Sequence, residues 1–284
     1  MINIFNNNIK VFALETGDFR LDGGAMMGSV PKVLWEKENP ADKLNRIDLA
    51  LRCLLIDDGN TCVLIETGLG NKINSSFIER FHIEQTEKPI EDSLNSIGYK
   101  LEDITHVILT HLHFDHSGGA TVIDETGHIR PIFPHAKYYI NKRNWDAGVE
   151  PNPRDRASYI IENFLAIKEN DQLILLGDDT IITENISSIV VNGHTPGQQL
   201  IKISYFDETL VFCSDLIPLK SHIKLPWIMG YDLNAMLTLE EKTHFLNKAA
   251  ENEWWLWFYH DPKIIAVKIQ KIGKNFDIID EIKR

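Results

Sequence analysis

Cysteine, basic charge and long apolar runs are all in short supply in this sequence. Of the 284 residues, three are cysteines (Cys53, Cys62 and Cys213), too few and too scattered for a disulfide framework or a cysteine-based zinc site. No apolar run approaches the roughly 18 residues of a membrane span, and the first residues lack the basic start and apolar core of a signal peptide. We therefore expect a cytoplasmic protein with no membrane segment, in which each cysteine is a small buried apolar residue.

The scarcity of basic residues limits the partners that the protein can have. Lysine and arginine together number 29 against 41 acidic residues, which gives a formal net charge of −12. A nucleic-acid-binding protein needs a basic footprint for phosphate groups, so we expect no nucleic-acid partner. An anionic small-molecule substrate is still compatible with this charge, because a bound metal ion can reverse the local field.

Short apolar segments separated by turn residues predict an α/β protein. Residues 45–56 and 61–66 flank an Asp-Asp-Gly-Asn turn and predict a hairpin, and residues 90–97 predict a short helix. Further strands are expected at 107–110, 172–175, 181–183, 187–192, 198–205, 209–214 and 254–259. This pattern predicts two packed sheets with helices outside them.

Three other segments carry specific expectations. Residues 238–250 predict an amphipathic helix, in which the charged run Glu240, Glu241 and Lys242 is interpreted as a solvated face. Residues 144–170 are less regular and are interpreted as an insertion over the site. Residues 263–284 alternate apolar and charged side chains and predict a final strand and helix.

The most informative segment is a histidine cluster that directly follows the strand predicted at 107–110. His111, His113, Asp115 and His116 place four ligand-type side chains within six residues. Burying so many polar groups without a partner would cost on the order of several kcal/mol, so a bound cation is the simplest compensation. The following Gly118-Gly119 pair leaves room for a tight turn into a helix. The segment therefore predicts a metal site.

These residues resemble the central signature of the metallo-β-lactamase-fold hydrolases. The other parts of the family pattern follow in order and at similar spacing: Glu66-Thr67-Gly68 as the early acidic turn, His194 within Gly-His-Thr-Pro-Gly, Asp215 as the bridging carboxylate and His260 as the last ligand. The resemblance runs from about residue 50 to residue 262. It implies a four-layer αββα sandwich in a single domain over 1–284, in which residues 1–45 wall the cleft.

The resemblance also implies a binuclear centre with two divalent ions. His111, His113 and His194 form one ligand set, Asp115, His116 and His260 form the other, and Asp215 reaches both ions. Mixed imidazole and carboxylate ligands suit zinc, and iron, manganese and cobalt are also compatible. Two ions sharing a hydroxide predict a hydrolase, with Asp115 as general acid/base and Glu66 supporting the ligands from behind.

Within the family, two stretches resemble the N-acyl homoserine lactonase and organophosphate hydrolase branch. One, residues 21–32, contains Met26 and Met27, and the other, residues 226–232, contains Trp227 and Tyr231; His222, in the loop 215–227 that leaves the metal edge, is a further candidate for substrate contact. The resemblance implies that the two stretches wall the substrate cleft and often form a homodimer contact. A methionine-lined turn packed in the core is the alternative interpretation of Met26 and Met27.

Three departures from the family pattern bear on the choice of substrate. Glu66 stands where many relatives have aspartate, Gln198 stands where several have histidine, and no tyrosine lies just beyond Asp215. Tyr231 and His222 are the candidates for contacting the substrate carbonyl instead. We expect a lactone or ester hydrolase, with a phosphotriesterase, a glyoxalase II-like thioesterase and a non-catalytic metal-binding sensor as the alternatives.

Overall fold

The computed structural model describes residues 1–2, 4–5 and 9–284, and the chain divides into two compact units. The first unit comprises Met1–Gly17 and Leu51–Asp178, and the second comprises Asp18–Ala50 and Asp179–Arg284. The boundary falls within the two longest N-terminal strands, so β1 (Lys10–Asp22) and β2 (Arg46–Asp57) each have residues in both units.

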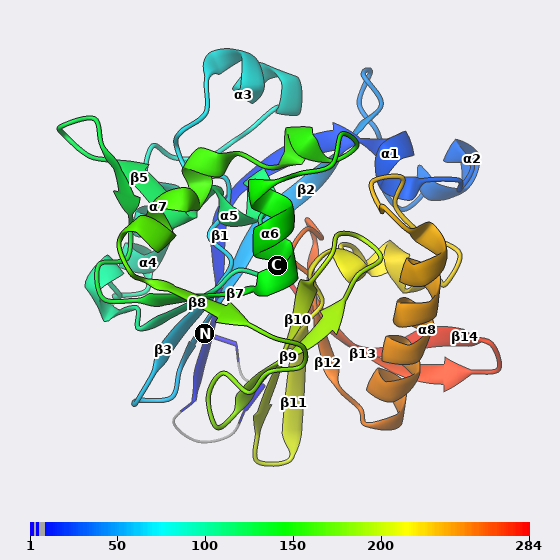
Figure 1. Ribbon diagram of the computed structural model, residues 1–284. Coiled ribbons are helices and arrows are strands. Elements are labelled where there is room, and N and C mark those ends of the chain that lie inside the picture. Colours follow the sequence, from blue (N-terminus) through cyan, green and yellow to red (C-terminus); the bar gives the residue numbers. More distant parts are fainter. Residues whose placement is uncertain (3, 6–8) are drawn as a thin grey trace. The chain divides into compact units, whose positions relative to one another are not determined.

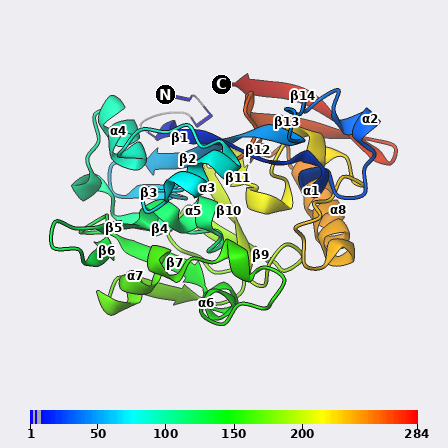
Figure 2. The same ribbon diagram turned by 90° about the horizontal axis from the view of Figure 1, so that it is seen from above.

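The first unit contains a six-stranded sheet with the order β1-β2-β3-β4-β7-β8 (Figures 1 and 2). Its other strands are β3 (Cys62–Ile65), β4 (His106–Ile108), β7 (Lys137–Asn141) and β8 (Leu173–Leu176), and a small separate sheet pairs β5 (Thr121–Ile123) with β6 (Ile129–Pro131). The α-helices are α3 (Ser75–Phe81), α4 (Pro89–Ser96), α5 (Phe114–Ser117), α6 (Lys142–Val149) and α7 (Leu165–Glu169). Short 3₁₀ turns lie at Leu101–Asp103, Gly118–Ala120, Arg156–Ser158 and Ile161–Asn163. The predicted hairpin is confirmed, because β2 and β3 pair antiparallel.

The centre of this sheet is parallel, and that arrangement sets where polar side chains emerge. β4 pairs in parallel with both β3 and β7, and Val107 and Ile108 of β4 are fully buried. A parallel strand covered on both faces is built from a continuous apolar run, as this segment is. Because Ile65 is in register with Ile108, the residues that follow β3 and β4 leave the same edge of the sheet.

The second unit contains a six-stranded sheet with the order β14-β13-β12-β11-β10-β9. These strands are β9 (Ile186–Val191), β10 (Gln198–Tyr205), β11 (Glu208–Phe212), β12 (Trp255–Trp257), β13 (Ile264–Ile272) and β14 (Asn275–Lys283). The helices are α1 (Gly23–Met27), α2 (Lys32–Trp35) and the long α8 (Ala235–Glu251), with 3₁₀ turns at Ser214–Leu216 and Lys220–Ile223. Figure 1 shows α8 in orange beside the strands of this sheet, and α8 contacts β13.

One face of α8 packs on the apolar core of the second unit. Phe245, Leu246 and Ala249 of the helix join strand residues such as Leu256 and Val267 in one buried cluster. The prediction that the helix's charged run is a solvated face is wrong for Lys242. This lysine is 1% exposed, because it lies on the same helical face as the buried residues Thr238, Phe245 and Ala249.

Two other predictions of secondary structure are also wrong. Residues 181–183 make a single bridge to β9 instead of a strand, because Ile182 and Thr183 turn back at once and both donate to the Ile186 carbonyl. Residues 263–284 form the hairpin β13–β14 instead of a strand and a helix, and Gly273 turns the chain with φ 62°.

All three cysteines are buried and free, as predicted. Within the described part of the chain, no helix combines the length and the apolar character that a membrane crossing requires.

Candidate metal centre

In the first unit, the histidine cluster emerges where β4 ends. His111, Asp115 and His116 are buried, and Glu66 reaches the same place from the end of β3. One ligand atom from each of Glu66, His111 and His116 lies within 4.8 Å of the others. The parallel register of β3 and β4 therefore brings an early carboxylate and the central histidines together, although 45 residues separate Glu66 from His111.

Glu66 is held in a fixed position behind the histidines. Its Oε1 accepts a hydrogen bond from the Thr110 amide at 3.1 Å and lies 3.4 Å from His116 Nδ1. Complete burial raises the pKa of Glu66, while the neighbouring His116 opposes that shift. The backbone of Glu66 is left-handed, with φ 67°, a conformation that non-glycine residues adopt at a cost of about 1 kcal/mol or more.

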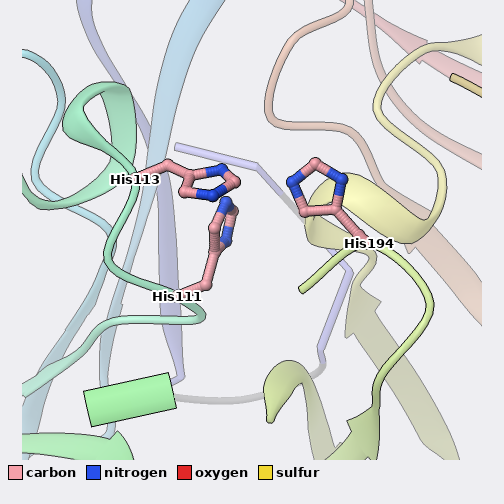
Figure 3. A group of neighbouring side chains, drawn as sticks. All are labelled: His111, His113 and His194. Atoms are coloured by element: carbon pink, nitrogen blue, oxygen red, sulfur yellow. The ribbon is translucent and has the colours of Figure 1, made fainter. Parts of the chain in front are cut away.

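The histidine rings themselves lie close together. Figure 3 shows His111 and His113 pointing toward one another from a single loop, and their ring centroids are 4.5 Å apart. The His111 and His116 centroids are 4.0 Å apart. Thr110 Oγ1 lies 3.0 Å from His111 Nδ1, which directs the other ring nitrogen away from the strand.

Two glycines fix the loop by close backbone packing. A Cβ atom on Gly118 would lie under 3.0 Å from the Leu69 carbonyl, and one on Gly119 would lie under 3.0 Å from the Thr67 carbonyl. Thr67 also binds the loop through two hydrogen bonds, since its amide and hydroxyl both donate to the His116 carbonyl, at 3.0 and 2.9 Å. The turn after β3 and the histidine loop therefore form one tightly packed element.

The segment 144–170, interpreted from the sequence as an insertion over the site, packs against this loop. The Leu112 amide donates to Asn144 Oδ1 at 2.8 Å, and the ring of Tyr159 lies 4.9 Å from that of His113 in an edge-on contact. Tyr159 was not among the predicted site residues, because nothing in the local sequence links it to a histidine 46 positions earlier.

In the second unit, three donors leave one edge of the other sheet. His194 lies in the β9–β10 turn, Asp215 follows β11, and His260 follows β12. β11 and β12 are parallel, with Phe212 in register with Trp257, so Asp215 and His260 emerge side by side. Asp215 Oδ2 lies 3.4 Å from His194 Nε2, and Asp215 Oδ1 lies 3.4 Å from His260 Nε2.

Polar groups behind these donors orient their rings. His194 Nδ1 lies 2.8 Å from Asp232 Oδ1, and His260 Nδ1 lies 3.0 Å from the Ala50 carbonyl. Since a carbonyl can only accept, His260 Nδ1 donates to the Ala50 carbonyl, and Nε2 is the ring nitrogen that faces Asp215. Asp232 was not predicted; an acidic residue closing the largely apolar stretch 225–231 was the available signal.

The donors fit metal binding in both chemistry and distance. Ligand atoms that are each about 2.05 Å from a tetrahedral zinc ion lie about 3.3 Å from one another. The two 3.4 Å separations at Asp215 match this value, and each involves a different carboxylate oxygen. Buried imidazoles with a carbonyl or carboxylate behind them are the usual arrangement of histidine ligands. The residues of each unit therefore fit divalent metal ions.

The predicted substrate residues occupy different environments in the second unit. Met26 and Met27 are buried, as the alternative interpretation of a core-packed turn expects. His222 is also buried, and its Nε2 lies 2.9 Å from the Met26 carbonyl. Trp227 is 8% exposed, whereas Tyr231 is 38% exposed.

Gln198 has a structural contact where several relatives have histidine. Its Nε2 donates to Ser214 Oγ at 3.0 Å, which connects the His194 turn to the segment that carries Asp215. Ser214 itself is left-handed, with φ 48°.

Known proteins resemble the chain over its whole length. A solved structure described as a probable metal-dependent hydrolase from Staphylococcus aureus is 30% identical, with a TM-score of 0.89 over 98% of this chain and 97% of that one. The dizinc quorum-quenching lactonase AidC, in complex with a product, is 20% identical, with a TM-score of 0.79 over 97% of this chain and 95% of its own. The predicted metallo-β-lactamase fold, of the α/β class, is confirmed by these structures.

Curated lactonases match a shorter stretch of the chain. An N-acyl homoserine lactonase from Bacillus cereus is 27% identical over 168 residues, which are 56% of this chain and 60% of the relative. The chain thus spans about 60% of the length of the curated lactonases that it matches.

The match to a family model shows to which family the chain belongs. The model of the metallo-β-lactamase superfamily matches residues 49–251, well over half of the chain. The chain therefore belongs to the metallo-β-lactamase superfamily.

Proposed function

We propose that the protein uses two divalent metal ions to hydrolyse a lactone or an ester, in the manner of an N-acyl homoserine lactonase. The observation that carries this proposal is the placement of Asp215 between His194 and His260, with one carboxylate oxygen 3.4 Å from each imidazole. A carboxylate that offers one oxygen to each side suits two ions better than one. The lactonase relatives and the dizinc lactonase AidC support the same choice.

In this proposal His111, His113 and His194 would hold one ion, Asp115, His116 and His260 would hold the other, and Asp215 would be a ligand to both. Zinc is the proposed metal, with iron, manganese and cobalt as compatible substitutes. The proposal treats residues 1–284 as a single hydrolase domain, in which residues 1–45 contribute to the cleft wall.

Bound metal ions would supply a hydroxide nucleophile at neutral pH and would polarise the substrate carbonyl. The remaining chemistry belongs to side chains of the protein. Asp115 is buried beside His116, with Oδ2 3.9 Å from His116 Nε2, and it is the proposed general acid/base: it accepts the proton of the hydroxide that has added to the carbonyl and passes it to the leaving alkoxide oxygen. Glu66 holds His116 and Asp232 holds His194, so neither ring rotates during turnover.

The proposed substrate is a neutral small molecule with an apolar acyl part. Met26 and Trp227 are proposed as the apolar wall against which such a chain packs when it binds, while Tyr231 and His222 are the proposed contacts for its polar end. Opening such lactones in bacteria would make the protein a quorum-quenching enzyme. A cytoplasmic location, to which three free cysteines are suited, and a homodimer are further parts of the proposal.

The test is a substrate panel on protein whose metal content has been measured. Lactones of short and long acyl chain, a phosphotriester, a thioester and a β-lactam would be assayed at equal enzyme and metal concentrations. We expect rapid lactone opening and no turnover of the β-lactam. Exclusive cleavage of the thioester or of the phosphotriester would overturn the lactonase proposal, and metal binding without turnover would favour a sensor.

A further inference from the structure

A lysine buried in the second unit holds three carbonyl groups of one loop. Lys242 Nζ, on α8, lies 3.2 Å from the His222 carbonyl, 3.2 Å from the Lys224 carbonyl and 2.6 Å from the Trp227 carbonyl. An ammonium group has three N–H donors and no acceptor, so these contacts match its hydrogen-bonding capacity. Burial lowers the pKa of Lys242 to about 7, and the carboxylate of Asp232 opposes that shift.

Position 242 of α8 faces the apolar core, where an apolar side chain would be expected to pack. The neighbours of Lys242 on the same helical face include Phe245 and Ala249, which belong to the core. A buried charge is costly unless hydrogen bonds or an opposite charge compensate it. The lysine therefore needs a reason other than packing, and the three carbonyls provide one.

The segment that Lys242 holds, residues 219–230 (the wall loop), is tied to α1. His222 carries its proton on Nε2, because this atom lies 2.9 Å from the Met26 carbonyl, which only accepts. The Gly230 amide donates to the Ala25 carbonyl at 2.8 Å. A Cβ on Gly28 would lie under 3.0 Å from the Ile228 carbonyl, so the two segments pack backbone to backbone.

The wall loop also leads directly to the residue that supports His194. Asp232, two residues beyond it, contacts His194 Nδ1, and the amides of Leu233 and Asn234 donate to the carbonyls of His194 and Gly193. Glu241, the residue before Lys242, accepts from the Asn192 and Gly193 amides at 2.8 and 3.0 Å. Two adjacent residues of α8 thus hold two loops by opposite charges.

We propose that Lys242 is a positioning residue that fixes the wall loop and α1 in one arrangement and so determines how tightly the enzyme binds the acyl part of its substrate. This inference rests on the proposed function, because it takes Met26 and Trp227 as the wall of that site. A wall held in advance costs less conformational entropy on binding than one that must be ordered by the substrate.

The test compares K242M with K248M in the metal-loaded protein. Lys248 lies on the same helix but is exposed. K248M therefore makes the same substitution, with the same loss of charge, without altering a contact of the wall loop. Hydrogen exchange measured by mass spectrometry would follow the amides of residues 219–230. In K242M we expect exchange there to be about 10-fold faster, with β9–β13 unchanged, as local opening predicts.

Kinetics give the second readout. We expect K242M to raise KM for a decanoyl lactone by about 5-fold or more, to leave kcat within about 2-fold and to leave the metal content unchanged, as loss of uniform binding predicts. K242Q keeps two N–H donors and should fall between K242M and the wild type.

Three results would overturn the proposal: wall-loop exchange in K242M equal to that in K248M, a kcat loss with unchanged KM, or failure of both K242M and K242Q to fold. The last would show that the lysine supports the unit as a whole. If the wild type opens no lactone, the lactonase proposal fails in that assay, while the exchange experiment still reports on the wall loop alone.

Discussion

The two units position their donors in different ways. In the first unit, His111, His113, Asp115 and His116 come from one short segment, joined by Glu66 from the neighbouring strand. In the second unit, His194, Asp215 and His260 come from three strand ends spread over 67 residues. A compact segment can be fixed as one rigid element, whereas scattered donors must each be fixed separately.

The supporting contacts follow that difference. Backbone packing holds the first segment, since Gly118 and Gly119 press on the carbonyls of Leu69 and Thr67. Charged side chains hold much of the second set, with Asp232 on His194 and Glu241 on the preceding amides. We infer that the first unit tolerates no added volume at its donor segment, while the second unit can be tuned by single polar substitutions.

The largest expected effect distinguishes the carboxylates of the two units. D115N should lower kcat by about 1,000-fold, because an amide cannot transfer the proton to the leaving oxygen. D215N should lower the metal content more than D115N does, because the bridging position needs a charged oxygen on each side. Turnover and metal analysis of the same preparations provide the measurement. Near-normal turnover in D115N would remove its proposed role.

Added volume at the histidine segment is expected to give the next largest effect. G119A should lower the free energy of unfolding by about 3 kcal/mol, the upper end of the usual cost of overpacking. G127A is the control, because a Cβ there meets nothing within 4 Å. Gly127 has φ 84°, so its substitution should cost about 1 kcal/mol from backbone conformation alone. Urea unfolding of both variants measures the difference, and equal losses would contradict the packing argument.

The supports of one histidine in each unit allow a matched comparison. D232N removes the charge behind His194, and T110V removes the hydroxyl that lies 3.0 Å from His111 Nδ1. D232N should weaken metal affinity by about 10- to 100-fold, as substitutions behind metal ligands commonly do. The neutral hydroxyl should matter less, so T110V should lose no more than about 5-fold. Competition with a chromophoric chelator gives both affinities, and a larger loss in T110V would reverse the comparison.

The smallest effect concerns Lys72, a charged side chain that supports the glycine segment of the first unit. Its Nζ lies 2.6 Å from the carbonyls of both Gly118 and Thr121, and burial lowers its pKa to about 8. Between pH 8 and the ordinary lysine pKa of about 10.4, the unfolded chain binds more protons at this site than the folded chain. The free energy of unfolding of the wild type should therefore rise with pH relative to that of K72M in this window. A flat difference across urea titrations at pH 7.5, 8.5 and 9.5 would contradict this assignment.

The same difference between the units explains what the sequence could predict. The histidine segment is local, so its spacing alone indicated a metal site. The second-unit donors were predicted from single residues at the ends of apolar strands and from the family resemblance, since nothing local marks Asp215 or His260.

The residues that support the donors could not be predicted, because their partners are distant in the sequence. Asp232 contacts a histidine 38 positions earlier, and Lys242 holds carbonyls 15 to 20 positions earlier. The charge of Lys242 predicts a solvent-exposed side chain, whereas its spacing from Thr238, Phe245 and Ala249 places it on the buried face of the helix. The prediction of a strand and a helix for the last hairpin is wrong because the many charged residues of 275–283 suggest a helix. The alternation of these residues with Phe276 and Ile278 is the pattern of the strand that forms.

We propose that seven side chains hold two divalent ions. Metal analysis of folded protein reconstituted with zinc, combined with calorimetric titration of the metal-free form, counts the ions that each chain binds. We predict two ions per chain in the wild type and the loss of one or both in D215A. Saturation at a single ion in folded wild-type protein, with D215A binding as well as the wild type, would contradict the account.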